Sequence, residues 1–560
     1  MTEPPNVASR AVERGPGSVL DRPLRLRHGL LLLWLAAVLL LVWHLGGVPL
    51  RDWDESLVAR VAEEISRVSF PGQLLPTFWG EAYLNKPPLL HGLIAGSLLI
   101  GRWLDPALAS VMAAPAWQVR LVPALCSSLI VPLLGLVQWR LRPGDRLAAL
   151  STAAVALTLL PLMRHGRLAM LDGTLVVAMV LQWWALLSLD REAQPEEQHR
   201  WALVVGLAGS IVLLLKAPAV LPLQAGGCLL LALERRWSLR QWPRLLGWMA
   251  VGLAPGLLWH LWHLSQRGSL ALQMWTGQGM ARVVQAMEGH SEGVSVPLLE
   301  VLEGGGPWLA LWPIAMVWAW QQRRQRWGRW VLGLTLLTAL MVLPLRTQLP
   351  WYSHLLWPSF CLAVGPLLAW LVSRQPSAGL PLQGLLVRVP WFWMLLGGVA
   401  VVLSPQLPIP MATALLAGVG LCSGGCLGLP LAGVWRPRAA ALMVLSLWAA
   451  LLALFNSSVW LWELNEMWPV TPAAAAIRAL PPTLRGLPLY RIGAHRPSLE
   501  WAIGHQIPAL PQDQQALRRR TPSLLVLADP PLQLPDWQCM PVQAPVLSDP
   551  PSPRLYHCQP

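Results

Sequence analysis

Three carboxylates follow the first long apolar run of the chain, in the sequence Arg51-Asp52-Trp53-Asp54-Glu55. Residues Glu55–Val68 then have helical periodicity, which predicts an amphipathic helix lying on a membrane surface. Acidic residues at the start of such a helix interact favourably with its dipole. That structural role accounts for Asp52 and Glu55, whereas Asp54 is the carboxylate that we expect to take part in chemistry.

The same part of the chain contains one of only two lysines among the 42 basic residues. It is Lys86, in the stretch Tyr83-Leu84-Asn85-Lys86-Pro87-Pro88-Leu89, where the two prolines restrict the backbone. The other lysine, Lys216, precedes Ala217-Pro218. Lysine and arginine are not equivalent as ligands, so both lysines are candidate functional residues. A lysine that only anchors the chain at the membrane interface is the alternative for Lys86.

Two later polar segments separate apolar runs. The first reads Arg164-His165-Gly166-Arg167 and continues to Asp172, and the second contains Arg346 and Tyr352. Arginine and aspartate in the first segment can simply pair with one another. Asp172, however, begins an apolar run, where an ionised group is costly, and this favours a functional role for it.

The composition predicts that the elements positioning these residues are membrane helices. The 560 residues are 55% hydrophobic and 12% charged, against about 25% charged residues in soluble domains. Many apolar runs approach the roughly 20 residues that cross a bilayer. The net charge of +14 comes from arginine clusters between these runs, which is typical of cytoplasmic loops and not of a nucleic-acid-binding surface.

We predict about thirteen transmembrane helices. The first run, Leu30–Leu45, has no small-residue cleavage site after it and is therefore expected to be a retained anchor. The other predicted spans are Val119–Trp139, Leu147–Leu162, Gly173–Leu189, Trp201–Leu215, Ala217–Leu233, Leu245–Leu264, Trp308–Trp320, Trp330–Leu345, His354–Val372, Trp391–Leu403, Met411–Val434 and Ala439–Phe455.

The apolar run Pro87–Leu104 is excluded from these spans by the distribution of charge. If it does not cross, the three arginine clusters at residues 140–146, 235–244 and 323–329 all lie in the cytoplasm. If it crosses, all three lie outside, against the positive-inside rule. We therefore expect this run to lie along the membrane or dip into it.

This topology divides the chain into three parts. Residues 1–28 form a cytoplasmic tail, residues 29–455 a transmembrane domain, and residues 456–560 a small exported α/β domain with strands near Leu487–Ile492 and Ser523–Leu527. Within the transmembrane domain, residues 46–104 form an exterior juxtamembrane segment. In an exported tail, Cys539 and Cys558 can form a disulfide.

A further exterior loop contains His290 between Glu288 and Glu292, but their spacing suits no standard metal site, so we interpret it as solvated.

The candidate residues Asp54, Asp172, Lys86, Lys216 and Tyr352 all map to the exterior face. Cationic side chains at headgroup depth can hold a phosphate, and a carboxylate among them can act as a general base. A transporter would instead need polar residues near the bilayer midplane and repeated halves. A flippase for lipid-linked sugars would share the phosphate ligands without needing Asp54, and a scaffold would need none of these residues.

The order of these motifs resembles the superfamily of protein O-mannosyltransferases and aminoarabinose transferases, which are glycosyltransferases of the GT-C class. The resemblance covers roughly residues 30–372. The matching stretches are Asp54-Glu55, Lys86-Pro87-Pro88-Leu89, Gly166-Arg167-Leu168-Ala169 through Asp172, Lys216-Ala217-Pro218 and Pro350-Trp351-Tyr352.

This resemblance implies transfer of a sugar, with inversion, from a polyprenyl-phosphate donor to a lipid, glycan or protein acceptor in a bacterial cell membrane. It implies Asp54 as the catalytic carboxylate near the acceptor, with Lys86 and Asp172 beside it and Glu55 as an acidic neighbour. The donor phosphate would be held by residues that include Lys216 and Arg346, to which we add Arg167, Tyr83 and Tyr352. The sugar, the acceptor and the need for a divalent metal stay open.

Overall fold

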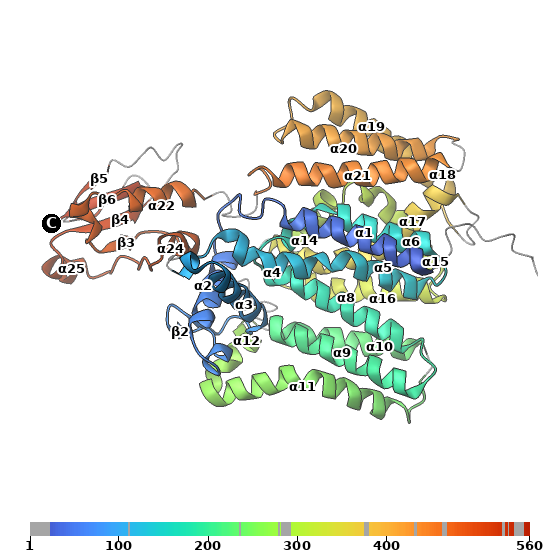
Figure 1. The fold of residues 1–560 in the computed structure, drawn as a ribbon, viewed down its shortest axis with the longest axis horizontal. Coiled ribbons are helices and arrows are strands. Elements are labelled where there is room, and N and C mark those ends of the chain that lie inside the picture. The colour runs from blue at the N-terminus through green and yellow to red at the C-terminus, as the bar shows by residue number, and fades with distance from the viewer. Residues whose placement is uncertain are drawn as a thin grey trace, which may run out of the picture.

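The computed structural model describes residues 23–109, 113–234, 237–277, 281, 293–374, 380–430, 434–461, 468–528, 532–535, 537–542 and 554–560. These residues form a helical bundle with a small mixed domain at one end (Figure 1). Residues 1–22 of the predicted tail (residues 1–28) lie outside the described residues. Its last residues, from Pro23, belong to helix α1 (Pro23–Val42). The loop residues Glu288, His290 and Glu292 also lie outside them.

Each predicted membrane span coincides with a helix or a pair of helices. Eight helices are long and apolar enough to cross a membrane, and the pair α6–α7, bent by 61°, is a ninth candidate among the described residues. The protein is therefore a multi-pass membrane protein, while the count of thirteen stays a prediction. The helices that correspond to the predicted spans after α1 are α4 (Ala116–Ser128), α5 (Ile130–Leu141), α6 (Arg146–Thr158), α7 (Leu160–Gly166), α8 (Leu171–Leu189), α9 (Pro195–Leu215), α10 (Val220–Leu233), α11 (Trp242–Arg267), α15 (Trp312–Gln321), α16 (Arg326–Val342), α17 (Trp357–Ser373), α19 (Val389–Leu403), α20 (Met411–Gly425) and α21 (Trp435–Phe455).

Basic residues from several loops meet at one end of the bundle. Arg146 donates a hydrogen bond of 3.0 Å to the carbonyl of Arg25 at the start of α1. Arg142 stacks over Trp318, and Arg326 lies 2.8 Å from Asp190. This end is opposite to the end that carries α2, α3 and the C-terminal domain (Figure 1). Such a separation is what the positive-inside rule requires of a single topology.

The juxtamembrane segment folds into α2 (Asp54–Arg67), a hairpin of β1 (Thr77–Phe78) and β2 (Glu81–Ala82), and α3 (Leu89–Leu104). The apolar side of α2, which includes Val58, Val61 and Ile65, is buried in the main core, where α2 packs on α3. This differs from the expectation that α2 rests on lipid, because α3 covers the face that was expected to meet the membrane. On α3, Trp103 is 80% exposed and is available to lipid.

The C-terminal domain has a four-stranded sheet in the order β3-β4-β6-β5, formed by β3 (Leu489–Arg491), β4 (Leu524–Ala528), β6 (Arg554–Gln559) and β5 (Gln538–Pro541). β3 and β4 are parallel, and the other pairs are antiparallel. β4 is buried on both faces. Helices α22 (Val470–Arg478) and α24 (Pro497–Ile503) pack on one face and α25 (Gln514–Arg520) on the other. Both predicted strand segments are therefore strands of this sheet.

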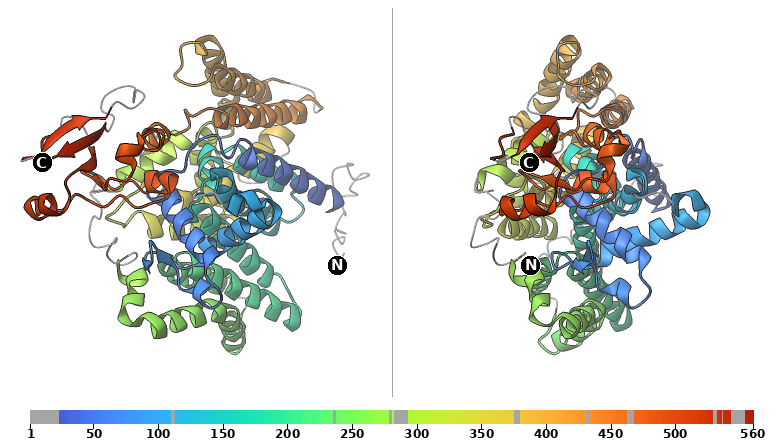
Figure 2. Two further views of the ribbon diagram at one scale, coloured as in Figure 1. Left: turned by 60° about the vertical axis from the view of Figure 1, so that its left-hand side comes forward. Right: turned by 90° about the vertical axis from the view of Figure 1, so that its left-hand side faces the viewer.

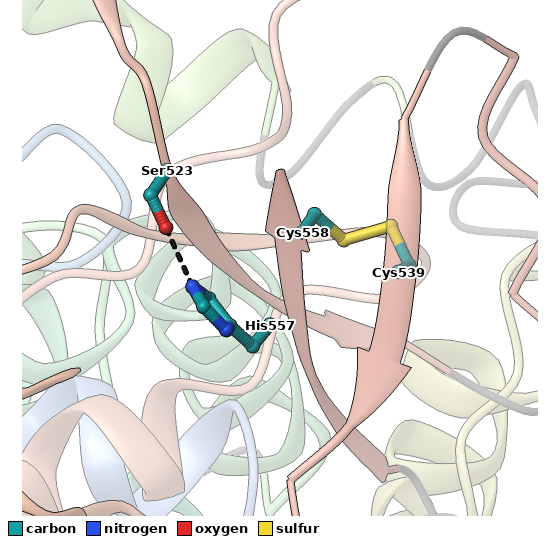
Figure 3. The surroundings of a disulfide bond; sticks show 4 residues. All are labelled: Ser523, Cys539, His557 and Cys558. Carbon is teal, nitrogen blue, oxygen red and sulfur yellow. Dashed lines mark hydrogen bonds between the residues drawn. A yellow bond between two sulfur atoms is a disulfide. The ribbon is translucent and has the colours of Figure 1, made fainter. Parts of the chain in front are cut away.

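The last strand is fastened to its neighbour by a disulfide. Cys539 and Cys558 face one another in the β5–β6 ladder and are joined through their sulfur atoms (Figure 3). On the same strand, the His557 ring nitrogen Nε2 lies 2.6 Å from the Ser523 hydroxyl (Figure 3). The pairing of these two cysteines thus agrees with the possibility raised from the sequence.

Candidate active site

Four elements bring predicted site residues together at the end of the bundle that carries α2 and α3. Asp54 begins α2, Asp172 lies in the first turn of α8, and Lys216 links α9 to the short helix η3 (Ala217–Ala219). The Lys216 ammonium lies 3.4 Å from a carboxylate oxygen of Asp172. It also lies 4.7 Å from the centre of the Tyr352 ring, which belongs to the short helix η7 (Pro350–Leu355). Lys216 is thus held between an acid and an aromatic face.

Electrostatic interactions place Asp54 in the same group. Burial raises the pKa of Asp54 to about 6, and the negative charge of Asp172 adds to this rise. The positive charges of Arg51, Lys86 and Lys216 act in the opposite direction and lower the pKa. Two carboxylates and three cations that were scattered over 166 residues of sequence, from Arg51 to Lys216, therefore share one site.

Tyr83 is the aromatic neighbour of Asp54. Its side chain is buried, and both burial and the charge of Asp54 raise the pKa of the Tyr83 hydroxyl, which therefore stays protonated at neutral pH. Its ring makes an edge-on contact with His91, with ring centres 5.4 Å apart. Tyr83 can donate a hydrogen bond within the site but is not a base.

The hairpin before Lys86 is fixed from two sides. Arg267, at the end of α11, donates hydrogen bonds to the carbonyls of Pro76 (2.7 Å) and Tyr83 (3.2 Å). Glu64 on α2 accepts hydrogen bonds from the Thr77 hydroxyl (2.5 Å) and the Trp79 amide (2.7 Å). These contacts hold the segment that carries Tyr83 and Lys86 against α2 and α11.

Glu55 has a structural role and does not face the site. Its carboxylate is fully buried and forms a two-pronged ion pair with Arg120 of α4, at 2.7 and 2.6 Å. It also accepts hydrogen bonds from the backbone amides of Arg51 (3.0 Å) and Ala169 (2.8 Å). Burial opposes its ionisation, but the charge and hydrogen bonds of Arg120 keep the pKa of Glu55 below its usual value. Glu55 thus has the structural role expected of it at the start of α2, and its part as an acidic neighbour of Asp54 in the site stays a prediction.

Arg167 also lies apart from the site. Its buried guanidinium donates a 2.8 Å hydrogen bond to the carbonyl of Trp43, just after α1, and stacks on Phe455 and Trp460. Among the described residues, the charges that shift the pKa of Asp54 do not include that of Arg167. The turn directs this arginine inward because the carbonyls at the end of α1 need donors. These contacts place Arg167 in the protein interior, and its role at a donor phosphate stays a prediction.

Two arginines differ from the sequence-based expectation in other ways. Arg346 is exposed in the loop before η7, and its role as a ligand of the donor phosphate stays a prediction. Arg51, to which we gave no role, is buried and acts on Asp54. Its position in the Arg51-Asp52-Trp53-Asp54-Glu55 motif was the available signal.

Within the described residues, no three His, Cys, Asp or Glu side chains lie close enough together to hold a metal ion. The described residues therefore offer no cluster of ligands for a divalent metal, and metal dependence stays an open question.

Comparison with known proteins identifies a family match and a similar fold. Residues 80–267 match the model of the family described as dolichyl-phosphate-mannose-protein mannosyltransferase. None of the curated proteins matches the sequence significantly. The structure superposes on the crystal structure of ArnT from Cupriavidus metallidurans bound to undecaprenyl phosphate, with a TM-score of 0.66, 17% identity, and coverage of 96% of this chain and 97% of the other.

The chain has the GT-C fold. The apo form of the same ArnT superposes with a TM-score of 0.66 and 17% identity, covering 95% of this chain and 98% of the other. The resemblance to the mannosyltransferase and aminoarabinose transferase superfamily is thereby confirmed. The family match includes Lys86, Asp172 and Lys216, whereas Asp54 precedes it. The tertiary structure brings Asp54 close to the matched segment.

Proposed function

We propose that this protein is a membrane glycosyltransferase that transfers a sugar from a polyprenyl-phosphate donor to a lipid, glycan or protein acceptor. The observation that carries the proposal is the meeting of Asp54 with Lys86, Lys216 and Asp172 at one end of a GT-C bundle. A similar fold binds undecaprenyl phosphate in the ArnT structure, which supports a donor of this class.

In the proposed reaction, the bond between the anomeric carbon and the phosphate oxygen breaks while the acceptor oxygen attacks from the opposite side. Lys86 and Lys216 bind the phosphate and stabilise the negative charge that builds up on it as it leaves. Asp54 takes the proton of the acceptor hydroxyl. Asp172 holds the Lys216 ammonium in place, and Tyr352 covers it. Inversion at the anomeric carbon follows from a single displacement.

Three further residues have supporting roles in this proposal. Tyr83 donates a hydrogen bond toward Asp54 or the acceptor. Arg346, exposed in the loop before η7, binds the phosphate of the donor from the exterior side. Arg51 stabilises the ionised form of Asp54.

We propose that the site lies on the periplasmic face of a bacterial cell membrane. The basic residues of the opposite end, such as Arg142, Arg146 and Arg326, are expected to face the cytoplasm. The C-terminal domain, with its Cys539–Cys558 disulfide, would then be periplasmic, where disulfides persist.

The test separates transfer from lipid transport. Purified protein in liposomes receives a panel of radiolabelled polyprenyl-phosphate sugars and a membrane extract as the acceptor, and release of free polyprenyl phosphate is measured. We expect release that depends on the acceptor, together with label in the acceptor fraction. Donor that crosses the bilayer intact, with no release under any condition, would show a flippase instead and would contradict the proposal.

Transfer should depend on pH through Asp54. A base must be ionised to accept a proton, and its pKa is about 6, so kcat/KM should fall about tenfold for each pH unit below 6. Above pH 7, the rate should be nearly independent of this group. The measurement is kcat/KM from pH 4.5 to 8.5 with the protein in one detergent. A flat profile over this range would exclude Asp54 as the base.

A further inference from the structure

The residues on either side of Asp54 are held by different parts of the protein. Glu55 is fixed by Arg120 in the transmembrane domain. Asp52, two residues before Asp54, is fixed by the C-terminal domain, 444 residues further along the chain. Asp54 therefore lies at the junction of two separately folded units. Figure 1 shows the contact between them, where α24 lies beside α2.

The contact of Asp52 with the C-terminal domain has three hydrogen bonds. One carboxylate oxygen accepts from the Arg496 guanidinium at 2.9 Å. The other accepts from the Ser498 amide at 3.1 Å and from the Ser498 hydroxyl. The Asp52 side chain is only 1% exposed and that of Arg496 is 19% exposed. A charge-assisted, buried contact of this kind fixes geometry more strongly than a surface ion pair.

Trp53 makes the second contact. Its ring meets the His495 ring edge-on, with centres 5.3 Å apart, and His495 in turn lies 2.9 Å from Glu500. The backbone of Trp53 has φ 62° and ψ −75°, which is unfavourable for a large side chain. Such a conformation persists only where the surroundings enforce it. Here the surroundings hold both neighbours of Trp53. Arg496 and Ser498 bind Asp52, the residue before it, and the ion pair of Glu55 with Arg120 fixes the chain after it.

We propose that the C-terminal domain positions the catalytic carboxylate. Arg496 and Ser498 hold Asp52, and His495 supports Trp53, so that the backbone enters α2 with the Asp54 carboxylate facing Lys86 and Asp172. This inference rests on the proposed function, because it concerns the orientation of the proposed base. Arg496 acts through position and not through its charge, since among the described residues it is not one of those whose charge shifts the pKa of Asp54. Docking of the domain thereby controls the rate of transfer.

The test compares Arg496→Ala with wild type in the transfer assay. We expect kcat to fall about ten- to hundredfold, because a displacement of about 1 Å in a reacting group has effects of this size. The donor KM should stay within about twofold, since Lys216 and Asp172 belong to other elements. The midpoint of the pH profile should shift below about 6, because a displaced Asp54 is less buried. Arg496→Lys, which keeps a donor, should recover part of kcat.

Arg485→Ala is the matched control. Arg485 is an exposed arginine of the same domain, and among the described residues its guanidinium donates to the Leu480 carbonyl, at 2.6 Å. This variant should keep the kcat and the pH midpoint of wild type. Folding of all variants is first compared by donor binding and by elution in gel filtration. Ser498→Ala is a milder second variant, because it loses the hydroxyl hydrogen bond to Asp52 but keeps the hydrogen bond from the backbone amide.

The outcomes separate this proposal from the proposed function. If wild type shows no transfer, the proposed function fails whatever the variants do. If wild type transfers and folded Arg496→Ala has an unchanged kcat and pH midpoint, the positioning role is wrong. A lower kcat with an unchanged pH midpoint, together with an equal loss of donor-binding capacity, would mean that less protein is folded. That result would also show that the positioning role is wrong.

Discussion

Replacement of Asp54 by Asn should lower kcat for sugar transfer about 10³-fold while leaving donor binding nearly unchanged. The reason is that a positioned general base contributes about 10²- to 10⁴-fold, whereas in the proposed function Lys86 and Lys216 hold the donor phosphate. The measurement is acceptor-dependent release of polyprenyl phosphate together with a binding isotherm for the donor. The control is Glu81→Gln, which changes an exposed carboxylate on strand β2 of the juxtamembrane hairpin and should behave like wild type.

The same variant should not lose stability. The pKa of Asp54 is about 6 in the folded protein, against 3.8 for an ordinary aspartate, so the folded state binds the proton more tightly than the unfolded state. Ionisation of Asp54 therefore reduces stability as pH rises from about 4 to 6. The melting temperature of Asp54→Asn, measured relative to that of wild type, should therefore increase as the pH is raised from about 4 to 6. Full transfer activity in a correctly inserted variant would show that Asp54 is not the base.

Replacement of Glu55 by Gln should have a large effect on stability. The change leaves the Arg120 guanidinium buried beside a neutral amide, and loss of one partner of a buried ion pair costs about 3–5 kcal/mol. We expect a marked fall in the midpoint of unfolding in detergent and a low yield in the membrane. Activity should fall in proportion to the amount of folded protein.

A double-mutant cycle checks the origin of this effect. Glu55→Gln, Arg120→Met and the combined variant are unfolded under one set of conditions. The losses should not add, because the two side chains interact directly. Arg120→Met will itself be costly, since Arg120 also donates to the carbonyls of Leu45, Val48 and Pro49. A Glu55→Gln protein that folds normally but is inactive would instead indicate a catalytic role for Glu55.

Asp54 and Glu55 show why neighbouring residues of the same type have different roles. Both are acidic and begin one helix, yet the α2 helix turns them in different directions. Glu55 meets an arginine that compensates for the cost of burying its charge, so its pKa falls. Asp54 is half-buried, and its loss of solvation together with the charge of the nearby Asp172 raises its pKa toward neutrality. The tertiary environment, and not the residue type, distinguishes the proposed base from the structural anchor.

The sequence by itself determined the membrane character of the protein, the positions of its apolar helices and the strands of the C-terminal sheet. Hydrophobic runs and alternating patterns are local properties, and burial depends on them directly. It also singled out Lys86, Lys216 and Asp172 as candidates, because ionisable groups at the ends of apolar runs are costly and therefore informative, and the structure brings them near Asp54.

Only the tertiary structure decided which charged groups meet. Arg120 pairs with Glu55, Arg167 turns inward to carbonyls after α1, and Arg496 reaches Asp52 across 444 residues. A side chain on a turn can point in several directions with similar local energy, and only packing against distant elements selects one of them. Ion pairs between distant segments leave no periodic signal in the chain, so their partners cannot be derived from composition or spacing.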